Sequence, residues 1–69
     1  MVKIINAVDD SKKILNIEFE DITIEELMNN LEINKIFIGA VLVNGVPKRL
    51  SDKFQDNSEI YVLPLLQGG

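Results

Sequence analysis

The side chains that most often catalyse reactions occur in this sequence without a second catalytic group placed to act with them. Two pairs of adjacent carboxylates occur, Asp9 with Asp10 and Glu25 with Glu26. A general acid and a general base must converge on one point with separated pKa values, and neighbours in a turn or at a helix start do not converge. We therefore expect these carboxylates to lie in solvent or to stabilise a helix start.

Nucleophilic and metal-assisted catalysis find equally little support. The chain contains no histidine and no cysteine, which excludes imidazole bases, thiolates, disulfides and nearly all zinc sites. Its serines, Ser11, Ser51 and Ser58, thus lack a histidine that could activate them. The glycines at positions 39 and 45 do not have the spacing of a phosphate-binding loop. We expect no bound cofactor and no bound metal.

The final stretch, Leu65-Leu66-Gln67-Gly68-Gly69, could take part in a reaction. It is a diglycine that follows an apolar stem. Glycine has no Cβ, so two glycines fit a channel too narrow for any side chain. Fully extended, the five residues after Pro64 reach about 16–18 Å, enough to carry the α-carboxylate of Gly69 into a partner's active site. A carboxylate is a poor electrophile, and adenylation by ATP on a partner enzyme would supply a good leaving group. A sulfur donor would then convert the acyl-adenylate to a thiocarboxylate.

Size and charge limit the classes of protein that this sequence can encode. The chain has 69 residues, of which 46% are hydrophobic, which predicts one compact domain. The 11 acidic and 7 basic residues give a net charge of −4, which argues against a nucleic-acid partner. We find no apolar run long enough for a membrane span and no signal peptide, and expect no membrane association and a cytoplasmic location.

The first half of the sequence predicts a hairpin followed by a helix. Residues 2–7 are apolar-rich, and residues 14–20 alternate, with Leu15, Ile17 and Phe19 on one face. The turn formers between them predict a β-hairpin. Apolar residues at 24, 27, 28 and 31 then follow the helical period, and Thr23 with Glu26 has the spacing of a capping box.

The second half predicts three strands. Residues 36–43 are apolar on both faces, with Phe37, Val41 and Val43 on one of them, which is typical of a central strand or one covered by a partner. Asn44-Gly45 favours a two-residue hairpin turn, and Pro47 restricts the return strand to an edge. Residues 59–64 form the last strand, expected to lie centrally beside the first. The prediction is an α+β domain, a mixed sheet of four to five strands packed on one main helix.

The final 29 residues, VLVNGVPKRLSDKFQDNSEIYVLPLLQGG, resemble the C-terminal half of the small sulfur carriers of the MoaD/ThiS family. The likeness lies in an apolar strand ending in Asn-Gly, an acidic turn, a strand of the type EIYVLP and a Gly-Gly end. Where that family usually has Asp-Gly-Asp, this chain has Asp56-Asn57-Ser58-Glu59, in which Asn57 can take the positive φ of the glycine. The order and length of the elements also match over the whole chain.

The resemblance implies a β-grasp (ubiquitin-like) domain over residues 1–64 and a flexible tail over residues 65–69. It implies that an adenylating enzyme, similar to ubiquitin-activating enzymes, uses ATP to activate Gly69, which becomes a thiocarboxylate. Gly68, which has no side chain, would enter the same narrow channel. The sulfur would pass to the large subunit of molybdopterin synthase or to thiazole synthase. The LPLLQGG stem favours the molybdopterin branch. On this reading the protein is a carrier and co-substrate rather than an enzyme.

Two other functions stay open. One is a ubiquitin-like protein modifier that uses the same tail, and the other is a plain β-grasp interaction module. For any of them, the sheet holds more apolar residues than one helix covers, so part of its open face, including Phe37 or Tyr61, is a candidate docking patch. Alternatively, Leu50, Phe54 and their loop cover that face. With the tail, these residues form the predicted partner-binding set: Leu65, Leu66, Gln67, Gly68, Phe37 and Tyr61.

Overall fold

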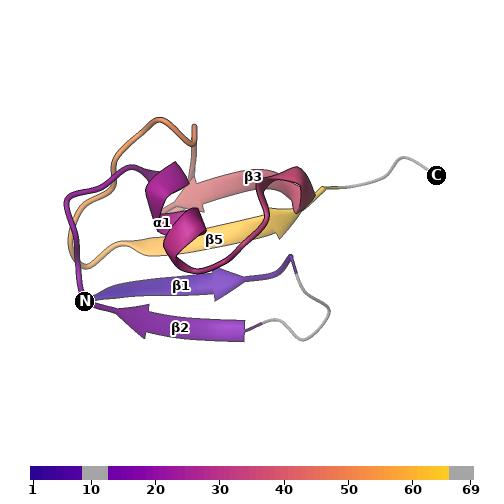
Figure 1. The fold of residues 1–69 in the computed structure, drawn as a ribbon. Helices are drawn as coiled ribbons and strands as arrows, with labels where there is room; N and C mark the ends of the chain where they lie inside the picture. The colour runs from indigo at the N-terminus through magenta and orange to yellow at the C-terminus, as the bar shows by residue number, and fades with distance from the viewer. Residues whose placement is uncertain (9–12, 66–69) are drawn as a thin grey trace.

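A computed structural model describes residues 1–8 and 13–65 of the chain. Within these residues, one α-helix and a five-stranded mixed sheet form an α+β structure, as the sequence predicted (Figure 1). The elements in chain order are β1 (Val2–Asn6), β2 (Lys13–Ile17), α1 (Ile24–Asn30), the 3-10 helix η1 (Lys35–Phe37), β3 (Ile38–Val43), β4 (Val46–Lys48) and β5 (Glu59–Pro64).

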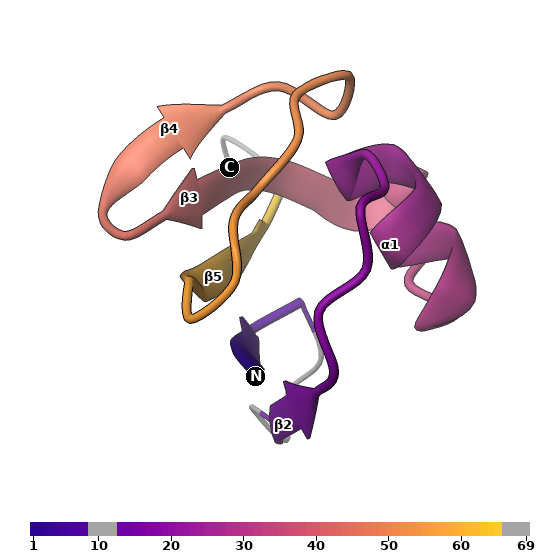
Figure 2. The ribbon, with the colours of Figure 1, turned by 90° about the vertical axis from the view of Figure 1, so that its left-hand side faces the viewer.

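The strand order is β2-β1-β5-β3-β4, and it confirms the predicted central position of the last strand. Strand β5 pairs in parallel with β1 and antiparallel with β3, while the two hairpins complete the edges. Figure 2 shows α1 on one side of the curved sheet. The residues of β5 therefore stand in the middle of the sheet and are flanked by a strand on each side.

The core lies between α1 and the sheet face that α1 covers. The helix supplies Ile24, Leu27 and Met28, which are all buried. The sheet supplies buried aliphatic side chains from its three central strands: Val2, Ile4, Val41, Val43, Ile60 and Val62. Burial of such side chains, worth about 1.5–3 kcal/mol each, is the main force that holds the helix on the sheet.

Helix α1 begins and ends with defined capping structures. Thr23 and Glu26 form the predicted capping box, each side chain bonding to the backbone of the other residue. At the other end, the amide of Ile33 donates to the carbonyl of Met28, and Glu32 takes a left-handed φ of 59°. This is a Schellman motif with glutamate where glycine is usual. At seven residues, α1 is much too short to cross a bilayer, and no other α-helix is described.

Strand β2 is shorter than the sequence predicted. It ends at Ile17, so the predicted extension to residue 20 is wrong. Phe19 instead packs edge-to-face on Phe54, with ring centroids 5.8 Å apart. An aromatic contact of this kind adds about 0.5–1.5 kcal/mol to the burial of the rings. We attribute the early end of the strand to this tertiary contact.

The predicted strand over residues 36–43 is also wrong at its start. Ile36 and Phe37 belong to η1, which Asn34 caps by accepting a hydrogen bond from the amide of Ile36 (3.1 Å). A bulge then lies between Ile38 and Ala40. Because the bulge inserts one residue, Ile38 packs against the core together with Val41 rather than on the opposite face.

Two predicted turns, at Asn44-Gly45 and at Asn57, are confirmed, while the turn predicted between β1 and β2 lies outside the described residues. Asn44 and Gly45 both have positive φ, 52° and 83°, and they join β3 to β4. Pro47 lies on the edge strand β4, where no ladder hydrogen bond is required of it. Asn57 has a φ of 62°, as expected for a residue that replaces a turn glycine. The loop that contains Asn57 folds over the end of the core, where Phe54 is buried.

Candidate functional site: the end of β5 and the open sheet face

Strand β5 carries the chain out of the sheet between two neighbours. Its last residue, Pro64, stands opposite Ile38 of β3. Proline has no amide hydrogen and cannot extend the ladder, so the strand stops there. The next residue, Leu65, still donates its amide to the carbonyl oxygen of Phe37 at 2.9 Å. The first residue of the predicted tail is thus attached to η1.

Gly39 allows this close approach of two backbones. A Cβ atom added at Gly39 would lie 2.9 Å from the Cα of Leu65, and nearer still to the carbonyl oxygen of Pro64. Real Cβ atoms do not come so close to backbone atoms, so any larger residue would push the end of β5 away from β3. The bulge at this position and the exit of the chain are therefore one structural unit.

A shallow apolar hollow lies beside this exit. Its volume is about 430 Å³, and its lining consists of Gly39, Ala40, Leu63, Pro64 and Leu65. None of these residues has a polar side chain, and the side chain of Leu65 is 55% exposed. A surface of this kind favours contact with an apolar side chain of another protein. We call it the exit hollow.

A row of mostly apolar residues crosses the sheet on the face opposite α1. The strand register places Ile14, Ile5, Tyr61, Leu42 and Pro47 next to one another, from β2 at one edge to β4 at the other. The loop with Leu50 and Phe54 packs on the core side and so does not cover this row. Within the row, Ile14 is exposed, Tyr61 and Leu42 are half-buried, and Ile5 is buried. The alternative in which that loop shields the open face is therefore wrong. We call these five residues the open-face row.

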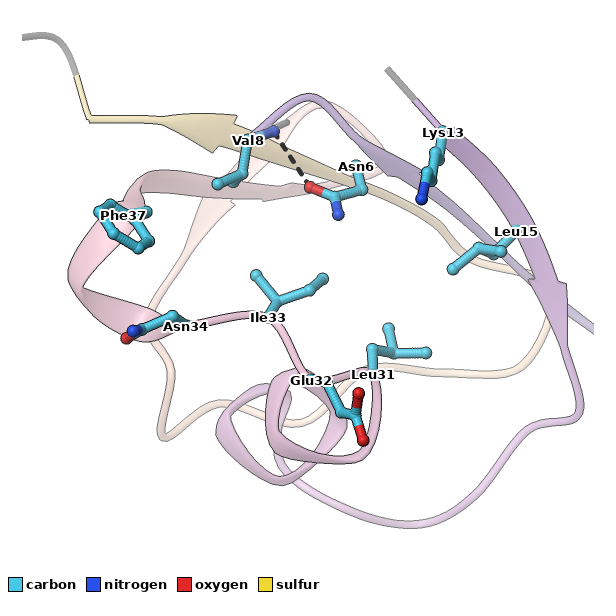
Figure 3. Close-up of a pocket in the computed structure, with 9 residues that line it drawn as sticks. All are labelled: Asn6, Val8, Lys13, Leu15, Leu31, Glu32, Ile33, Asn34 and Phe37. Atoms are coloured by element: carbon cyan, nitrogen blue, oxygen red, sulfur yellow. Dashed lines mark hydrogen bonds between the residues drawn. The ribbon is translucent and has the colours of Figure 1, made fainter. Parts of the chain in front are cut away.

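Phe37, predicted to share a surface with Tyr61, lies elsewhere. Its ring is 56% exposed and lines a hollow of about 490 Å³ on the helix side of the sheet, with Asn6, Lys13 and Ile33 among its neighbours (Figure 3). Tyr61 is half-buried on the open face. The structure thus separates these two residues, and of the pair only Tyr61 belongs to the open-face row.

The carboxylates considered at the outset have structural roles where they are described. Glu26 completes the capping box, and Glu25 accepts a hydrogen bond from Lys35 at 3.1 Å. Ser58 is buried and donates to the carbonyl of Gln55 at 2.6 Å. Residues 1–8 and 13–65 contain no cluster of three acidic side chains that could hold a metal ion. Asp9, Asp10 and Ser11 lie outside the described residues.

One carboxylate has a perturbed pKa. The N-terminal ammonium of Met1 donates to Asp56 at 2.9 Å, and the amide of Asn57 donates to the same oxygen at 2.8 Å. Hydrogen bonds to the charged form hold the pKa of Asp56 below its ordinary value of 3.8. This pair ties the chain start to the turn before β5, far from the exit hollow, and serves the fold rather than a reaction.

The remaining predicted site residues, Leu66, Gln67, Gly68 and Gly69, also lie outside the described residues. What the structure adds is the exit hollow at the end of β5, which the sequence did not indicate. Gly39 and Leu63 could have been suspected only from the pairing of β3 with β5, since neither has a chemically distinctive side chain. No protein-family model and no curated protein sequence matches the chain.

Proposed function

We propose that this protein is a β-grasp sulfur carrier of the MoaD/ThiS type, acting through a thiocarboxylate on Gly69. Sheet order β2-β1-β5-β3-β4 with one helix on one face is compatible with a β-grasp fold. The observation that carries the proposal is the central position of β5, the strand that ends at Pro64 between β1 and β3 and immediately precedes residues 65–69 in the sequence. The proposed reaction is taken from the resemblance of the C-terminal half of the chain to sulfur carriers.

The proposed reaction occurs in three steps on a partner enzyme. A carboxylate oxygen of Gly69 attacks the α-phosphorus of ATP, which forms the acyl-adenylate and releases pyrophosphate. The terminal sulfur of a persulfide on a donor protein then attacks the acyl carbon and AMP leaves, which gives an acyl disulfide. A thiol attacks the donor's sulfur atom in this disulfide and forms a new disulfide with it, and the thiocarboxylate is the leaving group. The carrier contributes no acid or base, in keeping with its lack of histidine and cysteine. Molybdopterin synthesis is the proposed destination of the sulfur.

The open-face row and the exit hollow are the proposed contacts for the adenylating enzyme. Leu42 and Tyr61 lie at the centre of the row, and Leu63 borders the hollow on the same strand as Tyr61. Apolar residues at the centre of a protein interface usually carry most of the binding free energy. An enzyme seated on this face would contact the end of β5, the last strand before residues 65–69.

Mass spectrometry of the protein isolated from its own cells, together with an exchange assay, tests the proposal. We expect an oxygen-to-sulfur replacement at Gly69, and ATP–pyrophosphate exchange by the adenylating enzyme of the same cells. Lysine adducts of Gly69 on other proteins would instead identify a protein modifier. No exchange, or a mature chain that does not end at Gly69, would refute both functions and leave an interaction module.

Two variants locate the docking face. Leu42→Asp places a charge in the open-face row, and we expect exchange to fall about tenfold or more through loss of desolvated apolar contact. Val46→Asp is the matched control, because Val46 is exposed on the neighbouring strand but pairs with the core residue Val43 and so lies on the helix-facing side. Equal activity in the two variants would remove the open face from the interface.

A further inference from the structure

The two edges of the sheet are protected to very different degrees. Edge strand β4 has only three residues, two of which are Pro47 and Lys48, a composition that discourages further pairing. Edge strand β2 has five residues and no proline, and its register with β1 is unbroken from Lys13 to Ile17. Figures 1 and 2 show no strand beyond it. A regular, unprotected edge is a template for another strand.

A groove runs along β2 on the side that faces α1. Two hollows form it, and both include Leu31 in their lining. Leu15 lines the larger one, which Figure 3 shows. Ile17 and Leu27 line the smaller one, which has a volume of about 150 Å³. Successive residues on one face of a strand are two positions apart, as Leu15 and Ile17 are. Alternate side chains of an added strand would thus reach first one hollow and then the other.

The groove carries more acidic than basic side chains. Figure 3 shows Glu32, Lys13 and the amide of Asn6 at the larger hollow. Asn6 accepts a hydrogen bond from Val8 through its oxygen at 3.0 Å, which leaves its amide hydrogens as donors there. Glu18 and Glu20 line the smaller hollow. None of these four charged groups, Lys13, Glu18, Glu20 and Glu32, forms an ion pair with a described residue.

A second copy of this chain does not suit that charge. Two β2 strands side by side would bring two grooves of the same acidic character together. Two chains of net charge −4 also repel one another. The groove therefore suits a different chain.

We propose that β2 and its groove bind an extended segment of another protein as a sixth strand. The segment has apolar residues at alternate positions and a basic residue at the end near Glu18 and Glu20. Backbone hydrogen bonds along the edge supply affinity, and the two hollows and their carboxylates supply selectivity. This site lies at the edge opposite β4 and is separate from the exit hollow.

The probe is a capped peptide, Ac-Lys-Val-Thr-Val-Thr-Val-Thr-amide, titrated into the isotope-labelled full chain. In antiparallel pairing its valines would face the groove and its lysine would lie near Glu18. We expect amide chemical-shift changes at residues 13–17 and slower hydrogen exchange there. The same peptide with N-methyl groups on alternate residues that face β2 keeps its side chains but loses its donors, and we expect no binding. Equal binding of both peptides would overturn strand addition.

A pair of variants separates the groove from the opposite side of the same strand. Leu15 and Ile14 are 38% and 57% exposed and point to opposite faces. Leu15→Asp puts a charge into the groove and should weaken peptide binding about tenfold, whereas Ile14→Asp should change it less than about twofold. Equal effects would refute the groove. Concentration-dependent shifts at residues 13–17 without peptide would overturn the proposal in favour of self-pairing, and the N-methylated peptide decides the matter if either variant unfolds.

Discussion

The amide nitrogen of Leu65 lies 2.9 Å from the carbonyl oxygen of Phe37 and donates a hydrogen bond to it. This bond joins the residue after β5 to the 3-10 helix before β3. It forms at the point where Gly39 leaves room for the backbone of residues 64 and 65. The start of the predicted tail is thus positioned by three backbone segments, and by no side-chain chemistry of its own.

Replacing Gly39 should disturb that junction. In Gly39→Ala the new methyl group collides with the carbonyl of Pro64 and the Cα of Leu65. We expect a loss of about 1–3 kcal/mol in the free energy of unfolding, measured by urea denaturation. Ala40→Val adds bulk at the next, exposed position and should be nearly neutral. A Gly39→Ala protein as stable as the parent would show that the strand end shifts freely.

Replacing Glu32 by glycine should stabilise the fold. Glu32 holds a φ of 59° at the end of α1, where a residue with a Cβ is strained. We expect Glu32→Gly to raise the free energy of unfolding by roughly 1 kcal/mol. Glu32→Ala removes the same carboxylate without relieving the φ strain and should show no such gain. Equal stability of the two variants would mean that the carboxylate, and not the backbone, sets the cost.

The capping box at the start of α1 should contribute measurably to stability. Thr23 accepts the amide of Glu26 at 3.2 Å, and no other described side chain accepts it. Thr23→Ala should cost about 1 kcal/mol, seen as a lower midpoint in thermal unfolding followed by circular dichroism. Thr23→Ser keeps the hydroxyl and should stay close to the parent. If serine is as damaging as alanine, the methyl group matters and the cap does not.

Asp56 should titrate below its ordinary pKa of 3.8 in a chain that begins with a free Met1 amine. Because the folded-state pKa is lowered, its contribution to stability is complete above the unfolded-state pKa and is lost as the pH falls through the folded-state value. Acetylation of the N-terminus should move the midpoint, followed by NMR, back up toward 3.8. It should not return fully, since the amide of Asn57 still donates. An unchanged midpoint would exclude the ammonium as the cause.

Loss of the last residue should separate stability from function. Deletion of Gly69 should abolish adenylation while leaving the thermal midpoint unchanged, because terminal residues outside a packed domain contribute little to stability. Gln67→Ala, which leaves the diglycine intact, is the control and should still be adenylated. A large fall in the midpoint would show that residues 66–69 have a structural role.

The accuracy of sequence-based inference differed from element to element for physical reasons. Thr23 with Glu26 and Asn44 with Gly45 act within a few residues, so local chemistry sufficed to predict the cap and the turn. The placement of β5 followed from its apolar composition. The bulge at Gly39 did not follow, because it depends on the pairing of β3 with a strand some twenty residues later.

The proposed site shows the same division. Tyr61 on the open face could be expected from alternation along β5. Phe37 could not be placed, since an apolar run reads alike in a strand and in a 3-10 turn. The groove beside β2 also escaped prediction, because it is formed by residues of β2, the end of α1 and the loop that follows, which only the folded chain brings together.

The parallel pairing of β1 with β5 has a consequence for biosynthesis. Strands β1 and β5 are the first and last strands of the described chain and are neighbours in the sheet. Lys3 can therefore pair with Glu59 only after Glu59 has been translated. Contacts between such distant parts of a chain slow folding and leave hydrophobic surface exposed until they form. A chain truncated before β5 would lack the middle strand of its sheet, so the described domain can close only after residue 64 has been synthesised.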